Sequence, residues 1–213
     1  MHVPDGFISP KVYLPAAAVA AGAWAYGLRR VRKDLDEEAI PRIAVLTAFS
    51  FVLMMIMIPL PGGTSAHAAG VGILAALFGV WISFLVVSLV LFLQAILFGS
   101  GGITVLPVNA LALGLAGSLA GAAAYRAFRP IREEAGLFAA GWFSVNLSAA
   151  LLALVLGLQP VIAHGPSGDP LFFPFGLSIT LPAVMIPHAL LGVGEGILTI
   201  MVVRLFRKIG GKT

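Results

Sequence analysis

The chain of 213 residues contains no cysteine, and this absence narrows the metal chemistry open to it. Without cysteine there is no disulfide framework and no thiolate metal site, so a zinc site built from four cysteines is excluded. Any metal ligand must be a nitrogen, an oxygen or a thioether sulfur. The sequence also lacks the full phosphate-binding motif Gly-x-x-x-x-Gly-Lys-Ser/Thr, so we do not expect the chain to hydrolyse ATP by itself.

Charged residues are scarce as well, at 10% of the chain, whereas 60% of residues are hydrophobic and the mean hydropathy is +1.04. This composition is typical of an integral membrane protein. We exclude nucleic acid as a partner despite the net charge of +4, because cations just beyond apolar spans are explained by membrane topology. No basic region precedes the first apolar run, so we expect no cleaved signal peptide and a retained, unblocked Met1.

The positions of the cations predict how the chain crosses the membrane. All but one of the 13 Lys and Arg residues fall within residues 29–42, 126–132 and 204–212. By the positive-inside rule these three clusters are cytoplasmic. We therefore expect a multi-pass protein of the cytoplasmic (inner) membrane with its N-terminus outside and its C-terminus cytoplasmic.

The apolar runs predict an all-α integral membrane protein with seven transmembrane helices, forming a single transmembrane domain over residues 1–213. The stretch 68–98 is ambiguous, because one helix of that length would measure about 46 Å against a hydrocarbon core of roughly 30 Å. Two spans with a tight turn near residues 79–81 keep the 126–132 cluster inside, so we expect two. The other expected spans are 12–28, 43–58, 108–125, 137–158 and 178–203.

Two histidines indicate a metal site. Met1 and His2 together offer the α-amine, the backbone nitrogen of His2 and its imidazole, and His67, in the glycine-rich break 61–67, can supply a fourth nitrogen. A roughly planar set of nitrogens suits Ni(II) or Cu(II), and with less preference Co(II), better than Mg or Ca. The alternative is a frayed terminus and a histidine that makes only a structural hydrogen bond.

Several further polar residues are weaker candidates. Asn109, at the start of an expected span, either caps its helix or orients His67 as a hydrogen-bond partner. Ser65 and Thr64 belong to the same break as His67 and are candidates for contacts around the metal.

The last expected span carries His188 and Glu195, which share one helix face. Ionisable groups inside a membrane are functional candidates, although we favour an interhelical hydrogen-bonded pair or a contact to a partner subunit. His164, in the polar loop 159–174, is expected to be solvated.

Three segments together resemble the CbiM/NikM family. They are Met1-His2-Val3-Pro4-Asp5-Gly6-Phe7, Gly62-Gly63-Thr64-Ser65-Ala66-His67, and the stretch 94–103 followed by Asn109. The family consists of substrate-binding S components of energy-coupling-factor (ECF) cobalt and nickel transporters. The resemblance implies that an extra first helix inserts the N-terminus into the core, where the Met1 amine, both His2 nitrogens and His67 hold the metal.

The resemblance also implies partners and a cargo. We expect a transmembrane coupling (T) component, two cytoplasmic ABC-type ATPases and, in many members, a small accessory membrane protein. The chain itself would be a transporter subunit and no enzyme. The planar nitrogen set and the Pro4-Asp5 form of the N-terminus favour nickel, while a cobalt-specific S component serving cobalamin synthesis stays open.

Two other classes of function compete with this interpretation. A rhomboid-like intramembrane serine hydrolase would use Ser65 as nucleophile and His188 as general base. However, Ser65 lacks the glycine that follows the nucleophile in such enzymes, and Met1 and His2 would be left without a role. A passive metal channel differs from an S component only in lacking a tight binding site.

Overall fold

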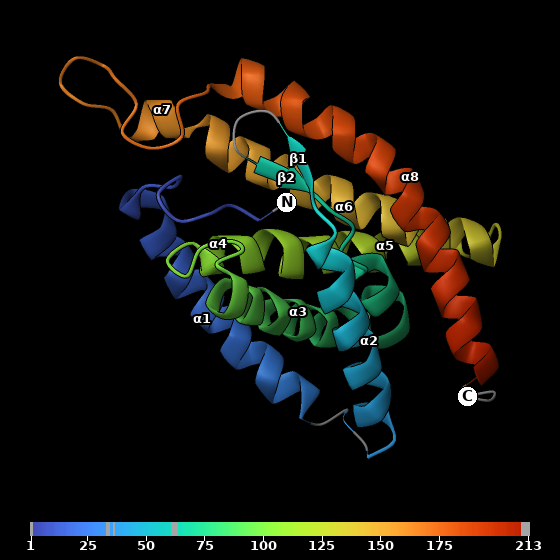
Figure 1. Cartoon of the computed structure of the whole chain (residues 1–213). Coiled ribbons are helices and arrows are strands. Elements are labelled where there is room, and N and C mark those ends of the chain that lie inside the picture. Colours follow the sequence, from blue (N-terminus) through green and yellow to red (C-terminus); the bar gives the residue numbers. More distant parts are fainter. Residues whose placement is uncertain (1, 33–34, 36, 61–63, 210–213) are drawn as a thin grey trace.

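The computed structural model describes residues 2–32, 35, 37–60 and 64–209, which are mostly helical (Figure 1). The helices are α1 (Pro10–Val31), α2 (Ala39–Met55), α3 (Val71–Phe98), α4 (Leu106–Asn109), the π-helix η1 (Ala110–Ala116), α5 (Gly117–Phe128), α6 (Glu133–Gly157), α7 (Gln159–Ile162) and α8 (Leu177–Ile209). Two short antiparallel strands, β1 (Ile58–Leu60) and β2 (Thr64–Ala66), lie between α2 and α3. Helix α6 packs along both α5 and α8, and α3 packs against α5 and η1.

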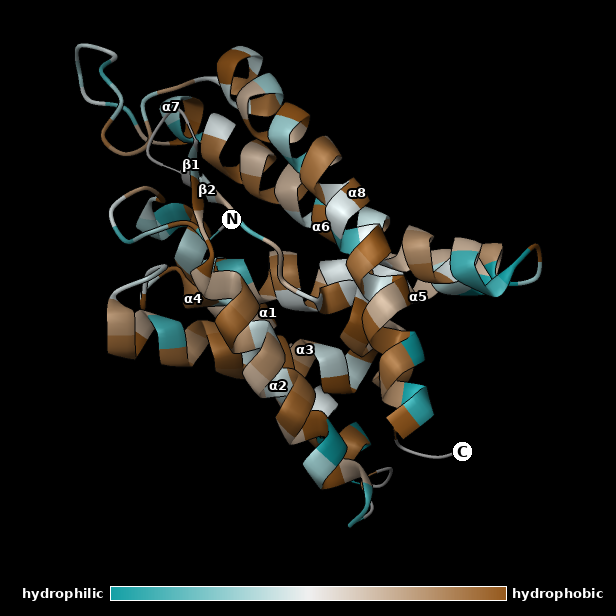
Figure 2. Cartoon of the chain, turned by 45° about the vertical axis from the view of Figure 1, so that its right-hand side comes forward, coloured by the Kyte–Doolittle hydropathy of each residue, from teal (hydrophilic) through white to brown (hydrophobic). Residues whose placement is uncertain are grey.

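Four of the described helical segments are long and apolar enough to cross a membrane, namely Val71–Phe98, Leu106–Phe128, Glu133–Ile162 and Leu177–Ile209. Helix α2 is apolar but shorter. Figure 2 shows hydrophobic residues along the helix bodies and hydrophilic residues at several helix ends and in the connecting segments. The mostly helical fold is therefore confirmed, whereas the count of seven spans and the orientation stay predictions.

Helix α3 is interrupted at Gly79, inside the predicted turn at residues 79–81. Gly79 has a φ of 78° and a ψ of −177°, a conformation that strains a residue with a side chain. The arm before it, residues 71–78, would be about 12 Å long, too short to cross a bilayer. The break lies where the sequence predicts it, but the structure does not provide two complete spans here.

The small residues of the predicted span 108–125 pack inside the chain. A Cβ added at Gly114 would lie 3.0 Å from the Phe84 ring, and one at Gly117 would lie 2.6 Å from the Ser148 hydroxyl. Close approach of helices is the usual role of small residues in membranes. These two glycines therefore let α3 and α6 of the same chain approach closely.

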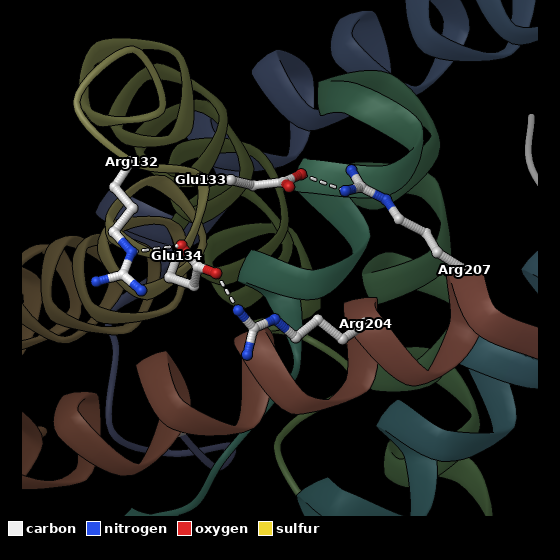
Figure 3. A network of polar contacts seen from close by, with 5 residues as sticks. All are labelled: Arg132, Glu133, Glu134, Arg204 and Arg207. Atoms are coloured by element: carbon white, nitrogen blue, oxygen red, sulfur yellow. Dashed lines mark hydrogen bonds and ion pairs between the residues drawn. The ribbon is translucent and has the colours of Figure 1, made fainter.

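Two of the cation clusters meet where α6 begins and α8 ends (Figure 3). The ion pairs are Arg204 with Glu134, Arg207 with Glu133, and Arg132 with Glu134. The three arginine side chains are largely exposed, between 45% and 75%. Exposed ion pairs contribute little to stability, so we regard these as surface contacts that tie two helix ends together.

Candidate metal centre

The segment before α1 is held inside the molecule by hydrogen bonds from distant parts of the chain. The Val3 amide donates to Asn109 Oδ1 and the Asn109 side-chain amide donates to the Val3 carbonyl, both at 3.0 Å. The Gly102 amide also donates to the Val3 carbonyl, at 3.2 Å. Farther along, the Ser9 amide donates to Gln159 Oε1 at 2.9 Å. Residues 2–9 are therefore held in a defined conformation, and the alternative interpretation of a frayed terminus is wrong for this segment.

Asp5 fastens the same segment to the glycine-rich connection that follows α3. Its carboxylate accepts the backbone amides of Ile103 and Thr104, each at 3.0 Å, and the Thr104 hydroxyl. Burial raises the pKa of Asp5, but the hydrogen bonds from Thr104 and Ile103 outweigh it and hold that pKa below its ordinary value. Asp5 is therefore a carboxylate at neutral pH, and its charge strengthens these bonds.

His2 and His67 come together in the interior, although they are far apart in sequence. The two residues are 5% and 1% exposed, and their ring centroids lie 4.4 Å apart. The Nε2 atom of each ring is buried and has no hydrogen-bond partner among the described residues. Buried polar atoms are nearly always paired, so two adjacent unpaired imidazole nitrogens indicate a binding site for a third group.

The protonation of both rings suits a metal ligand. The His67 Nδ1 atom lies 3.1 Å from the Ala68 carbonyl oxygen, so Nδ1 carries the proton and donates it, which leaves a lone pair on Nε2. Burial lowers the pKa of His2 to about 3, and burial lowers the pKa of His67 well below its ordinary value. Both imidazoles are therefore neutral at physiological pH, the form that binds metal ions.

An open cavity of about 370 Å³ leads to His2, lined also by Pro4, Met57, Pro59, Ser65, Ser100 and Gly101. The hairpin of β1 and β2 forms one wall, and the connection after α3 forms another. Gly101 has a φ of 77°, and a Cβ there would lie 3.1 Å from the Cβ of His2. Glycine at this position therefore lets the connection approach the histidine closely.

The remaining candidate residues of the metal site differ in whether the structure describes them and in what they contact. Met1 and residues 61–63 lie outside the described residues. Asn109 bonds the backbone of Val3 rather than His67, so it orients the segment that carries His2. The Ser65 hydroxyl lies 3.8 Å from the Met57 sulfur, and Thr64 pairs with Leu60 in the hairpin.

The two ionisable residues of α8 do not pair with each other. His188 Nδ1 lies 2.7 Å from the carbonyl of Val184 in its own helix, and its Nε2 has no partner among the described residues. It therefore does not hold the Ser65 hydroxyl as the general base of a serine hydrolase would. Glu195 instead accepts the backbone amides of Ala69 and Gly70 at the start of α3, so it bonds to a neighbouring helix as expected, through backbone amides that the sequence pattern does not identify. His164 is exposed.

Comparison with known proteins relates the whole chain to metal transporters. A family model described as the cobalt uptake substrate-specific transmembrane region matches residues 2–212. The fused nickel transport protein NikMN of Rhodobacter capsulatus is 38% identical over 93% of this chain and 59% of its own length. The cobalt transport protein CbiM of Geobacter sulfurreducens is 34% identical over 98% of this chain and 60% of its own. The chain thus spans about three fifths of the length of these curated relatives.

Solved structures show the same fold. The crystal structure of a truncated transition metal transporter superposes with a TM-score of 0.94, at 33% identity and with 100% of both chains covered. A second structure of a transition metal transporter also has a TM-score of 0.94, at 34% identity, and covers 98% of this chain and 93% of that one.

Proposed function

Because the chain belongs to the CbiM family of cobalt uptake substrate-specific transmembrane proteins, we propose that it binds Ni(II) or Co(II) at the outer membrane face and delivers the metal for uptake. In this proposal it is the S component of an ATP-driven ECF transporter in the cytoplasmic membrane. The metal is the transported substrate, and no reaction is catalysed by the chain itself.

The observation that carries the proposal is the pair of adjacent, buried, neutral imidazoles, in which the His67 Nε2 atom lacks a partner among the described residues. A late first-row divalent metal ion is the natural acceptor for such nitrogens, whereas Mg and Ca would require oxygen ligands. In this proposal the Met1 amine, the His2 backbone nitrogen and His2 Nδ1 form one chelate, because Nε2 of that ring cannot reach a metal bound to its own backbone nitrogen. The His67 Nε2 atom supplies the fourth nitrogen. Supporting evidence comes from the curated relatives, one named as a nickel transport protein and one as a cobalt transport protein.

We favour nickel over cobalt, since four nitrogens in a plane suit Ni(II) better than Co(II). The donor set includes no sulfur and no carboxylate in this proposal, so neither a thiolate-preferring ion nor Mg is expected to compete strongly. Cobalt remains the second substrate to test, because both metals occur in the names of the relatives.

The transport step requires partners, because the sequence has no phosphate-binding motif of its own. We propose that a transmembrane coupling component and two ABC-type ATPases reorient the chain so that the site opens to the cytoplasm. A small accessory membrane protein is a further partner in this proposal. The cavity beside His2 is the entry route on the outer side in this proposal.

The test compares binding with uptake. Titration of the purified full chain with Ni(II) and Co(II) is expected to give a dissociation constant of about 1 μM or lower. Uptake of radioactive nickel by cells is expected only when the partner subunits are produced together with the chain. Absence of tight binding would refute the S-component role, and equal uptake without partners would indicate a passive channel.

A further inference from the structure

Glu195 lies in the middle of α8 and yet contacts the backbone immediately after His67. The side chain is buried, at 1% exposure. Its Oε1 atom accepts the amide of Ala69 and, at 3.0 Å, the amide of Gly70. Ala69 and Glu195 are separated by 126 positions in the sequence, so this contact is a product of the tertiary fold.

The two amides need an acceptor from elsewhere because of their position before α3. Both amides precede the first residue of α3, so no carbonyl of that helix accepts them, and buried backbone amides are nearly always paired. Gly70 is the residue that precedes α3, it has no side chain to offer, and no side-chain cap occurs at this helix start. The carboxyl group of Glu195 takes the place of a local cap and also lies where the helix dipole favours an acceptor.

One peptide group connects Glu195 to the metal-binding histidine. The Ala69 amide, which donates to Glu195, and the Ala68 carbonyl, which accepts from His67 Nδ1 at 3.1 Å, belong to the same peptide unit. A peptide unit is planar and rigid, so fixing its N–H end also fixes the direction of its C=O end. The orientation of the His67 ring therefore depends on where Glu195 holds this peptide.

Glu195 is itself locked in place by neighbouring helices. A Cβ added at Gly141 of α6 would lie only 2.5 Å from the Glu195 carbonyl oxygen, so the two helices touch here. A Cβ at Gly72, in the first turn of α3, would lie 2.6 Å from the backbone of Gly141. The close packing of α3, α6 and α8 leaves the Glu195 side chain little room to shift.

We propose that Glu195 is a positioning residue of the metal centre: through the Ala68–Ala69 peptide it sets the direction in which His67 presents Nε2 to the metal. This inference rests on the proposed metal-binding function. Groups that orient a metal-bound histidine through its other ring nitrogen typically change metal affinity by 10- to 100-fold when removed. Glu195 acts one bond further away, through a backbone carbonyl rather than directly on the ring.

The experiment uses three variants of the purified full chain, titrated with Ni(II) and Co(II). Glu195→Leu removes the acceptor at similar size and is expected to weaken binding at least about tenfold and to shift the ligand-field absorption of the complex. Glu195→Gln retains a side-chain oxygen that accepts both amides, so its affinity is expected to stay within about threefold of the unchanged chain and its spectrum to stay the same. Thr199→Val is the matched control, because Thr199 is buried on the same helix and donates only to the Glu195 carbonyl, at 2.7 Å.

The Thr199→Val control is expected to have a lower thermal stability than the unchanged chain when both are metal-free, but to bind metal normally. Three outcomes would overturn the inference: unchanged binding in Glu195→Leu, an equal loss in Glu195→Gln, or an equal loss in Thr199→Val. If Glu195→Leu cannot be purified, Glu195→Asp is used in its place, since its shorter carboxyl group cannot reach both amides. Unchanged metal binding in Glu195→Asp would overturn the inference. Failure of the unchanged chain to bind either metal would instead refute the proposed function.

Discussion

Polar side chains at the metal centre differ in burial and in pairing from those where α6 begins and α8 ends. His2 and His67 are buried and have ring nitrogens without partners among the described residues. Arg204 and Arg207 are exposed, and each is paired with a carboxylate (Figure 3). Burying an unpaired polar atom is costly, whereas an exposed ion pair changes stability little. The first arrangement is the one that the proposed binding site requires, and the second is a surface contact between two helix ends.

The largest effect on metal binding is expected from changes at the N-terminus. Adding one residue before Met1, or acetylating its amine, removes the chelate formed by the amine and the following histidine, so metal binding should be lost while the fold persists. The same residue added at the C-terminus is the control and should leave binding intact. Titration calorimetry measures both, and an N-terminally extended chain that still binds nickel tightly would show that the amine is no ligand.

Removal of one imidazole should have the next largest effect. We expect His67→Ala to weaken nickel binding by about 100-fold, since one of four nitrogen ligands is lost and a cavity replaces it. His164→Ala should bind normally, because His164 is exposed in the loop before α8. Equal losses in the two variants would place the metal in that loop instead of the interior.

The pH dependence of metal binding should reflect protonation of the terminal amine and not of the imidazoles. Burial lowers the pKa of His2 to about 3 and also lowers the pKa of His67, so both rings stay neutral through the range where free histidine titrates. A terminal amine titrates near 8, and the His2 backbone nitrogen must release its proton to bind Ni(II). As the pH is lowered, affinity should therefore fall about tenfold for each pH unit above that value and about 100-fold for each unit below it. Binding curves between pH 8.5 and roughly pH 5 should show no second bend near 6.5.

The same pKa values predict the stability of the metal-free chain. In the unfolded chain the histidines take up protons below about pH 6.5, whereas buried His2 does so only near pH 3. The unfolded state thus binds more protons in this window, and stability is lost as the pH falls. Thermal unfolding curves of the unchanged chain and of His2→Asn measure this, and the variant should show the shallower slope. Parallel slopes would mean that burial does not hold His2 neutral.

Local sequence patterns were sufficient for part of this architecture. Glycine within a long apolar run predicts an interruption, and Gly79 has the positive φ that such an interruption requires. Apolar runs also indicate most helices to within a few residues, although α8 extends to Ile209, beyond the expected end at residue 203. Ligand chemistry and the family resemblance single out His2 and His67, and the structure brings the two rings together.

Contacts between distant segments were not predictable from those patterns. Nothing in the local sequence around Asn109 indicates that its amide faces Val3 rather than His67. Small residues in 108–125 predict close packing but do not identify the neighbour, which at Gly114 and Gly117 is α3 and α6 of this chain. The bonds from Ala69 and Gly70 to Glu195 depend on how α3, α6 and α8 pack together, so only the tertiary structure reveals them.

A smaller effect on metal binding is expected at Asn109. Asn109→Leu removes both hydrogen bonds to Val3 and should weaken nickel binding about tenfold, because the segment that carries His2 loses its anchor to α4 while the bond from Gly102 remains. Asn146→Leu is the matched control, since Asn146 is also buried and its amide donates to Trp142 of its own helix. Both variants should lose about 1–3 kcal/mol of stability, but only the first should lose affinity.

The smallest effect is expected where α6 begins and α8 ends. Glu134→Gln weakens the contacts with Arg132 and Arg204, which are exposed and screened by salt, so the thermal midpoint should fall slightly in dilute buffer and the difference should vanish in concentrated salt. Nickel affinity should not change, because none of these side chains contacts the segments around His2 and His67. A weaker nickel affinity in Glu134→Gln would contradict this comparison. It would mean that α8, which carries both Arg204 and the Glu195 contact to the backbone after His67, transmits changes from the ion pairs to the metal centre.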